Sequence, residues 1–97
     1  MKPLPLKLCK NGYCYTQVLR GKRSCVYRQE VLKDNFYYEV FLIKTLPADE
    51  FKGKAIPQRE KFPYNEAFGH WAWSYKSYDQ AYKAFLSLES GKSNPNN

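Results

Sequence analysis

The strongest strand pattern in the chain is Phe36-Tyr37-Tyr38-Glu39-Val40-Phe41-Leu42-Ile43-Lys44. Successive side chains of a β-strand point to opposite faces of the sheet, and here both sets are largely apolar. A strand that is apolar on both faces is typical of the centre of a sheet that is covered on both sides. We therefore expect residues 36–44 to form a central strand, with the flanking segments supplying the rest of the sheet and its cover.

The segment before this strand predicts a β-hairpin. Tyr13–Arg20 is rich in side chains that favour strands, and the Gly21-Lys22 that follows fits a two-residue loop. A second strand then runs from about Arg23 to Val31, and turn residues at Lys33-Asp34-Asn35 join it to the central strand. The first half of the chain thus predicts consecutive antiparallel strands.

A two-residue loop fixes which residues of the hairpin face each other. Arg20 lies opposite Arg23 beside the turn, where like charges repel. Tyr13 and Tyr15 point outward in this register. The pairs expected on the inner face are Val18 with Cys25, Thr16 with Tyr27 and Cys14 with Gln29.

The segment Thr45–Tyr64 is the least regular part of the sequence. Prolines interrupt it, and Lys52-Gly53-Lys54 can turn a hairpin within it. Its charges nearly cancel, which indicates a solvated excursion rather than a second basic site. Just beyond it, Asn65–Gly69 has a cap residue, an acid in the first turn and a terminal glycine, so we expect one helical turn there.

Trp71, Trp73 and Tyr75 alternate with smaller or polar residues, which predicts a further strand with an aromatic face. Exposed aromatic side chains on a sheet can stack on bases. In so small a domain, however, we expect these three rings to pack in the core beneath a helix.

That helix follows directly, because Ser77 and Gln80 form a capping box and Gly91 provides a stop. Its inward stripe at helical spacing is Tyr78, Ala81, Tyr82, Phe85 and Leu88. The expected fold is α+β, an antiparallel sheet of three to five strands with one C-terminal helix packed on a face. Residues 1–90 form a single domain and residues 91–97 a flexible tail.

The chain has 97 residues, enough for one small domain with one core. Apolar residues make up 43% of it and aromatic residues 18%, which excludes disorder. The longest apolar run, Val40–Ile43, is far below the ~20 residues that span a bilayer. Prolines break the first residues, which do not form a secretory signal, so we expect a cytoplasmic protein without a membrane partner.

Cys9, Cys14 and Cys25 are an odd number of cysteines, which argues against a disulfide framework. In the predicted register Cys14 and Cys25 are also too far apart for a bond. We expect free thiols that pack as small apolar groups. With His70 the cysteines have the composition of a zinc site, but their spacing disagrees, so we expect no metal and no cofactor.

The sequence contains no evident catalytic constellation. A nucleophile needs a base and an orienting group nearby, and His70 is the only histidine. The paired acids Asp49-Glu50 lie in a loop, and the glycines are isolated rather than part of a phosphate-binding loop. We therefore expect a binding protein rather than an enzyme, and we assign no catalytic residue.

The net charge of +7 arises in the first 28 residues. Seven lysines and arginines precede the first acid, Glu30, and from there the nine acids balance the nine remaining cations. A one-sided excess of charge attracts phosphate or an acidic protein surface, although a surface that only keeps the protein in solution explains the same charge. The candidate contact residues are Lys7, Lys10, Tyr13, Tyr15, Arg20, Lys22, Arg23 and Arg28.

We expect this basic N-terminal segment and hairpin tip to contact nucleic acid with little sequence specificity. Lysines and arginines neutralise phosphates, and outward tyrosines add stacking. The alternative is a protein-interaction module. Such a module would meet an acidic protein surface through the basic tip, or pair with a partner through an exposed edge strand.

Several short motifs occur together in a known group of proteins. They are Lys10-Asn11-Gly12-Tyr13, Tyr37-Tyr38-Glu39-Val40, Glu60-Lys61-Phe62-Pro63-Tyr64-Asn65-Glu66-Ala67-Phe68-Gly69 and Trp71-Ala72-Trp73-Ser74-Tyr75. In these motifs the chain resembles short uncharacterised proteins of Bacteroides-type bacteria and their phages, over about residues 10–90. The resemblance implies a phage or mobile-element setting and no particular activity.

The C-terminal part also distantly resembles the WGR domain, in which a Trp-rich strand leads into a helix. The defining Trp-Gly-Arg is missing here, where the chain reads Phe68-Gly69-His70-Trp71. This second resemblance therefore implies a strand followed by a helix and nothing about activity.

Overall fold

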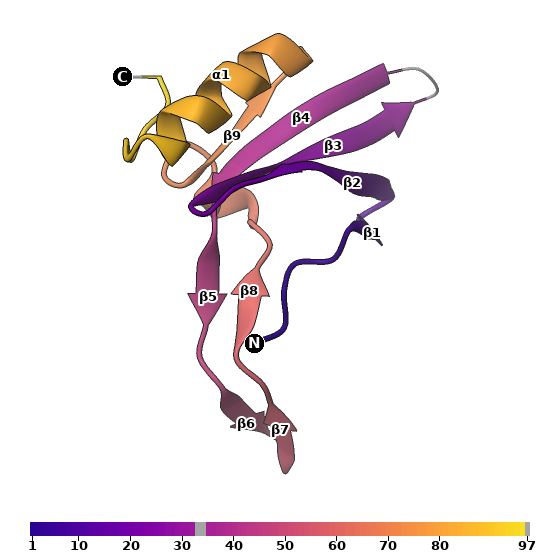
Figure 1. Ribbon diagram of the computed structural model, residues 1–97. Coiled ribbons are helices and arrows are strands. Elements are labelled where there is room, and N and C mark those ends of the chain that lie inside the picture. The colour runs from indigo at the N-terminus through magenta and orange to yellow at the C-terminus, as the bar shows by residue number, and fades with distance from the viewer. Residues whose placement is uncertain (33–34, 97) are drawn as a thin grey trace.

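The computed structural model describes residues 1–32 and 35–96. In this part of the chain, five antiparallel strands form a sheet in the order β1-β2-β3-β4-β9, and the helix α1 lies across one face of it (Figure 1). These elements are β1 (Lys7–Lys10), β2 (Tyr13–Arg20), β3 (Ser24–Leu32), β4 (Asn35–Leu42), β9 (Ala72–Tyr75) and α1 (Tyr78–Glu89). The expected α+β fold, an antiparallel sheet with one C-terminal helix, is confirmed. The predicted turn at Lys33-Asp34-Asn35 falls largely outside the described residues.

The strand predicted to be central, β4, is an interior strand that pairs with β3 and with the edge strand β9, whereas the middle strand of the five is β3. Val40 belongs to the apolar cluster under α1 and Phe41 to the cluster on the other face, and both side chains are fully buried. Because β-strand side chains alternate, one strand serves both clusters. The predicted cover on both sides of this strand is confirmed.

Under the helix, β9 contributes Trp73 and the half-buried Tyr75, as predicted. The buried residues of α1 are Ala81, Ala84, Phe85 and Leu88. Tyr78 and Tyr82, which were expected in the inward stripe, are each 42% exposed, so that expectation is wrong. Tyr78 lies at the flank of the helix, where its ring packs edge-on against Tyr38 and stacks on Tyr82.

α1 begins after Ser77, whose hydroxyl accepts a hydrogen bond from the Gln80 backbone amide at 3.1 Å, as the capping motif predicts. It ends before Gly91, which has a positive φ of 107°. Beyond the helix, the Tyr75 hydroxyl donates to Asn96 Oδ1 at 2.9 Å, so this part of the tail lies against β9. Across residues 1–32 and 35–96, no helix is long and apolar enough to cross a membrane.

On the face away from α1, the core is built from aromatic rings. Tyr27 and Phe41 stack with ring centres 5.6 Å apart, and Phe62 packs edge-on against both. Trp71 belongs to this cluster, where it packs edge-on against Phe41. We expected Trp71 under the helix, which is wrong, because it precedes β9 and does not follow the alternation of that strand.

β1 and β2 form a hairpin that was not predicted from the sequence. Its loop is Asn11-Gly12, and both residues have a positive φ (54° and 82°), as this type of two-residue turn requires. Cys9 pairs with Cys14 across the strands, and their sulfur atoms form a disulfide bond. The expectation of free thiols is therefore wrong for these two residues and holds for the buried Cys25.

β2 and β3 form the predicted hairpin, but in a different register. Arg20 pairs with Cys25 rather than with Arg23, because the connection is longer than two residues, and a β-bulge within β2 shifts the register again. In place of the predicted pairs, Gln17 faces Tyr27, Thr16 faces Arg28 and Cys14 faces Glu30. Tyr15 consequently points into the core with 5% of its surface exposed, so its predicted outward orientation is wrong, whereas Tyr13 is exposed.

Residues 44–61 leave the sheet as a narrow two-stranded ribbon that points away from it (Figure 1). The remaining elements are β5 (Lys44–Leu46), β6 (Asp49–Phe51), β7 (Lys54–Ile56), β8 (Arg59–Lys61) and the predicted helical turn η1 (Asn65–Ala67). β5 pairs with β8 and β6 with β7, and the predicted turn at Lys52-Gly53 closes the tip. Backbone hydrogen bonds join Lys2 to Gln58 and Glu60, so the N-terminal segment runs alongside β8.

Candidate nucleic-acid interface

The eight residues predicted to contact a partner lie in three separate places. They are Arg20, Lys22 and Arg23 at the β2–β3 turn, Lys7 and Arg28 on the helix side of the sheet, and Lys10, Tyr13 and Tyr15 around a pocket on the other face. The alternation of side chains along β1, β2 and β3 separates them. Their charge is therefore divided among three surfaces.

The guanidinium of Arg20 is bound by Glu60 of β8. Its two terminal nitrogens donate to the two carboxylate oxygens at 2.7 and 2.6 Å. The hydrogen bond from Arg20 lowers the pKa of the Glu60 carboxyl below its ordinary range, and the Leu4 backbone amide, which donates to the same carboxylate, adds to this effect. Arg20 therefore joins β2 to β8, and its hydrogen bonds to Glu60 would have to break before it could bind a partner.

The β2–β3 turn is fastened to the end of α1. The Glu89 carboxylate accepts hydrogen bonds from the backbone amides of Lys22 and Arg23 at 2.8 and 2.9 Å, and from the Ser24 hydroxyl at 2.6 Å. A side-chain carbon at Gly21 would lie 2.2 Å from an oxygen of this carboxylate, so a larger residue there would displace the Glu89 side chain from the turn. Burial alone would raise the pKa of Glu89, but these hydrogen bonds lower it overall. The predicted hairpin tip is thus a fixed joint.

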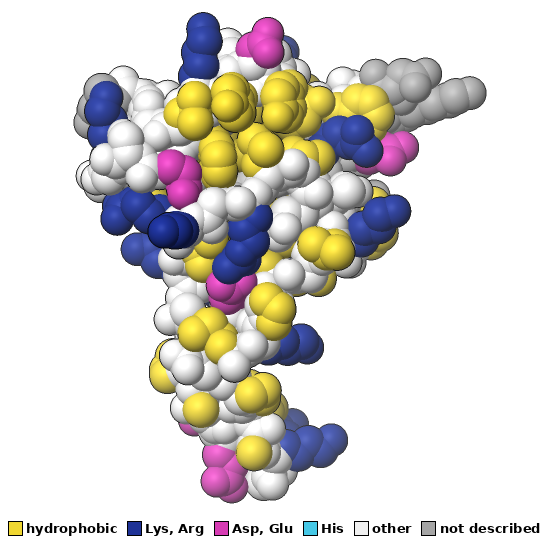
Figure 2. Space-filling view, viewed as in Figure 1, with side chains coloured by type: hydrophobic (Ala, Val, Ile, Leu, Met, Phe, Trp, Pro, Cys, Tyr) yellow, Lys and Arg dark blue, Asp and Glu magenta, His cyan; other side chains and the backbone are white. Residues whose placement is uncertain are grey.

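Lys22, Arg23 and Lys44 line one groove of about 330 Å³ beside this joint, together with two apolar residues. We call it the basic groove. Arg23 Nε donates to the Leu88 backbone oxygen at 2.9 Å, which holds that side chain at the edge of the groove. Figure 2 shows lysine and arginine side chains gathered on this side of the molecule, between the helix and the ribbon. The groove has the charge to hold an anion such as phosphate.

Lys7 and Arg28 lie in one row across the sheet, because Thr16 pairs with both of them. The guanidinium carbon of Arg28 is 4.8 Å from the centre of the Phe36 ring, a cation–π contact. Residues paired in this way share a face, and theirs is opposite to the face of Lys10.

Lys10, Tyr13 and Tyr15 come together at a polar pocket of about 150 Å³. The pocket lies between the sheet face away from α1 and the chain segment around η1. Its polar and aromatic lining includes Lys10, Tyr13, Tyr15, Gln29, Glu39 and Asn65. Four strands and the segment after β8 contribute to it, so only the folded chain assembles this pocket.

Beside the pocket, two lysine side chains lie against the ring of Tyr64. The Nζ atoms of Lys10 and Lys61 are each 5.4 Å from the ring centre, and Tyr64 is 55% exposed. Lys10 also lies 4.7 Å from the centre of the Phe62 ring and donates to the Pro63 backbone oxygen at 3.2 Å. An accessible aromatic ring with cations beside it is the combination by which proteins bind single strands of nucleic acid.

Glu39 is the acid of the polar pocket. Only 8% of its surface is exposed, and its carboxylate has no hydrogen bond or ion pair within the part of the chain that the structure describes. Burial raises its pKa to about 7, and the charge of Lys10 opposes part of this rise. The pocket therefore contains a buried acceptor group that changes its charge near neutral pH.

Tyr15 and Gln29 add further polar atoms to this pocket. Gln29 Nε2 donates to the Tyr15 hydroxyl oxygen at 2.9 Å. Burial raises the pKa of Tyr15, the charge of Glu39 raises it further, and the hydrogen bond from Gln29 opposes the rise. Tyr15 therefore stays protonated at neutral pH and has a hydroxyl proton to donate.

Glu39, Lys61 and Tyr64 were not among the predicted site residues. Glu39 carried a usable signal, because it is the single acid in an apolar central strand, and such an acid is a candidate for a perturbed pKa. Lys61 and Tyr64 carried none, since they meet Lys10 only after the ribbon has returned to the sheet.

The cysteines and the histidine take no part in the polar pocket. Cys9 and Cys14 are bonded to each other, and burial raises the pKa of Cys25 to about 12, so its reactive thiolate does not form near neutral pH. His70 is exposed at the surface. Among the described residues, no three metal-ligating side chains come together.

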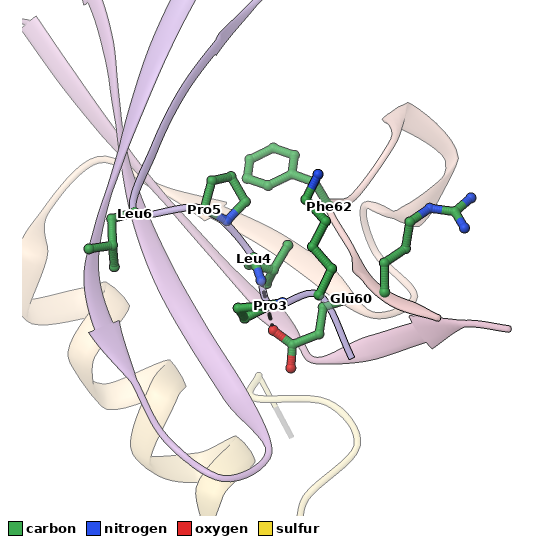
Figure 3. A pocket seen from close by; sticks show the side chains of 8 residues that line it. Pro3, Leu4, Pro5, Leu6, Glu60 and Phe62 are labelled. Atoms are coloured by element: carbon green, nitrogen blue, oxygen red, sulfur yellow. Dashed lines mark hydrogen bonds between the residues drawn. The ribbon is translucent and has the colours of Figure 1, made fainter. Parts of the chain in front are cut away.

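A larger, apolar pocket of about 590 Å³ lies between the N-terminal segment and β8 (Figure 3). The residues from Pro3 to Leu6 form one side of it, and Glu60 and Phe62 belong to the other. The Glu60 carboxylate already accepts hydrogen bonds from Leu4 and Arg20. The acid of this pocket therefore holds the fold together.

No protein-family model, curated protein or solved structure matches the chain. The resemblances to short proteins of Bacteroides-type bacteria and their phages and to the WGR domain stay predictions. Any assignment of function therefore depends on the geometry of the surfaces described above.

Proposed function

We propose that the protein binds single-stranded nucleic acid at the surface formed by Lys10, Tyr13, Lys61 and Tyr64, which we call the stacking surface. The observation that supports this most directly is the exposed Tyr64 ring with two ammonium groups, each 5.4 Å from its centre. Bases stack on such a ring, and phosphates are attracted to such cations. The net charge of +7 favours any polyanion.

A single strand fits this surface better than a duplex does. Stacking on tyrosine needs a base that is not already enclosed by its neighbours, and the bases of a duplex are stacked and paired. Tyr13, which is 38% exposed, and Tyr64 supply two accessible rings. The basic groove supplies a second place for phosphates of a longer strand. The proposal includes no catalytic step.

The test is a fluorescence anisotropy titration of short single- and double-stranded RNA and DNA at two salt concentrations. We expect single strands to bind with a Kd of roughly micromolar or tighter, and binding to weaken as salt rises. Tyr64→Ala should weaken binding by about 1–3 kcal/mol, which is the range for losing one stacked base. Lys61→Glu should reduce the slope of the salt dependence by about one.

Lys54→Glu is the matched control for Lys61→Glu. Lys54 is an exposed lysine of β7 in the outer part of the ribbon, so its replacement makes the same change in net charge away from the stacking surface. We expect its effect to be small. Loss of binding in Lys22→Glu but not in Lys61→Glu would move the interface to the basic groove. No binding of any nucleic acid at low salt would contradict the proposal.

A second candidate function is that of a protein-interaction module, and the observation that favours it is the basic groove. Its cations lie beside apolar residues, a combination that suits an acidic peptide as well as a phosphate. Binding of an acidic peptide that depends on Lys22 and Lys44, with no nucleic acid bound, would support this function. An accessory protein of a phage or mobile element is the setting that we would then propose.

The cytoplasm is the compartment that we propose for the protein, because nucleic acid is accessible there. Cytoplasmic thiols are kept reduced, so the disulfide between the exposed residues Cys9 and Cys14 is the feature of the structure that tests this location. Alkylation of intact cells before lysis, followed by mass spectrometry, measures their state. A disulfide already present in growing cells would contradict the cytoplasmic location.

A further inference from the structure

We propose that the polar pocket selects guanine, with Glu39 accepting hydrogen bonds from the Watson–Crick edge of the base and Lys10 donating to its O6 atom. The inference rests on the proposed function, which supplies the strand that carries the base. It adds a preference for one base to a binding mode that is otherwise indifferent to sequence.

The Glu39 carboxylate determines which ligand groups the polar pocket can accept. An ionised carboxylate only accepts hydrogen bonds, and its two oxygens can accept from two neighbouring donors at once. Only 8% of the surface of the Glu39 residue is exposed, the residue lines the pocket, and its carboxylate lacks a partner among the described residues. Because a buried charge without partners is costly, a ligand that brings donors is favoured there. A ligand with two adjacent N–H groups can donate to both oxygens of the Glu39 carboxylate.

Guanine has this pattern and the other bases do not. Its Watson–Crick edge presents the O6 acceptor, then the N1–H donor, then the 2-amino donor, in that order. The corresponding edges of adenine, cytosine and uracil never present two adjacent donors. A carboxylate in the pocket therefore distinguishes guanine from the other three bases.

Lys10 extends the match to the third position of that edge. Its ammonium group has three donors, of which one goes to the Pro63 backbone oxygen at 3.2 Å. Within the residues that the structure covers, Lys10 and Glu39 line the same pocket but do not form an ion pair. An edge with the order acceptor, donor, donor fits between an ammonium group and a carboxylate.

The pocket also suits the flat shape of a base. Its volume of about 150 Å³ has room for one base. Tyr13 and Phe68 line it, and aromatic side chains hold unpaired bases by stacking on them. Lys10 belongs both to the pocket and to the stacking surface, so a strand bound at Tyr64 brings its bases to the pocket.

The proposed contact requires ionised Glu39, so the guanine preference should increase as pH rises. The pKa of Glu39 is about 7. The titratable groups that line the pocket with it are Lys10 from β1 and Tyr13 and Tyr15 from β2. Since the pKa of Tyr15 is raised from an ordinary value of 10.0, we attribute a change near neutral pH to Glu39.

The test uses the full chain and single-stranded oligonucleotides that differ at one central base, followed by fluorescence anisotropy. We expect guanine to bind about tenfold more tightly than the other three bases, within the range for a bidentate contact. Inosine lacks the 2-amino group and should lose most of this advantage. Glu39→Gln replaces one acceptor oxygen by a donor and should abolish the preference. The preference should also weaken between about pH 8 and about pH 6.

Glu30→Gln is the matched control for Glu39→Gln. Glu30 is exposed, and it pairs with Cys14 on the helix side of the sheet, away from the pocket. The Glu30→Gln variant should keep the full preference for guanine. If oligonucleotides bind equally well whatever their central base, the guanine inference is wrong and the proposed function stands.

Mononucleotides separate a base within a strand from a free nucleotide. Guanosine and inosine 5′-monophosphates are added alone, and binding is followed by NMR chemical shifts. Binding of the guanosine compound that Glu39→Gln abolishes would support the pocket even if no oligonucleotide bound. That combination would overturn the proposed function and assign the pocket to a free nucleotide.

Discussion

Glu39 lies in β4 with only 8% of its surface exposed, and burial raises its pKa from an ordinary value of 4.5 to about 7. The folded protein therefore holds this proton more tightly than the unfolded chain does. For this reason the free energy of unfolding should fall as pH rises from about 4.5 to about 7, and stay low above that range. A shift of this size corresponds to about 3 kcal/mol. A residue that lowers stability in this way is typical of a functional site.

We predict that Glu39→Gln removes most of this pH dependence. At about pH 8 the variant should be more stable than the unmodified protein by about 1–3 kcal/mol, because it no longer buries a charge. Urea unfolding at about pH 5 and about pH 8 measures both quantities. The exposed Glu30→Gln variant should keep the original slope. Parallel stability profiles for Glu39→Gln and the unmodified protein would show that Glu39 is not the group responsible.

At the residue scale, the sequence predicted some members of the site but not their arrangement. Lys10, Tyr13 and Tyr15 were selected for charge and stacking, and they do share a pocket. Tyr15 was placed on the wrong face, because a one-residue change of register moves every side chain of a strand to the other side. Glu39 was treated only as part of the strand pattern, although it is the acid of this pocket.

At the scale of elements, the correct predictions have local causes. β4 was predicted from its two apolar faces, α1 from the cap at Ser77, and the ribbon tip from Lys52-Gly53. Each signal acts over a few residues and needs no distant partner. The loop Asn11-Gly12 is equally local, and it is among the strongest signals for a two-residue hairpin. With it, the Cys9–Cys14 pair could have been predicted.

The turn of the β2–β3 hairpin is held by a residue that is distant in sequence. This residue is Glu89, which comes from the far end of α1 and accepts hydrogen bonds from the turn amides. Gly21 leaves room for that carboxylate. From the local sequence alone, Gly21 was assigned only a role in the loop. No pattern within residues 13–31 contains this information. This tertiary contact holds the turn in the longer connection that accompanies the observed register.

At the scale of the whole molecule, Glu60 connects three parts of the chain that are far apart in sequence. Glu60 is a residue of β8. Its carboxylate accepts hydrogen bonds from Arg20 of β2 and from the Leu4 amide of the N-terminal segment. Lys61 and Tyr64 of the stacking surface follow within a few residues. The position of the stacking surface therefore depends on this joint as well as on its own contacts.

We predict that Glu60→Gln destabilises the protein by about 1–3 kcal/mol at neutral pH, because Arg20 then loses a charged, two-point partner. The pKa of Glu60 is lowered in the folded protein, so its contribution is present above the ordinary value of 4.5 and lost as pH falls through its folded pKa. The unmodified protein should therefore lose its stability advantage over Glu60→Gln in acid.

Single-strand binding should weaken together with stability in the Glu60→Gln variant, because the segment that carries Tyr64 is less firmly held. Urea unfolding across this pH range, with the exposed Glu66→Gln as control, measures the effect. Equal stability of Glu60→Gln and Glu66→Gln at neutral pH would mean that the contact between Arg20 and Glu60 contributes nothing to the free energy of unfolding.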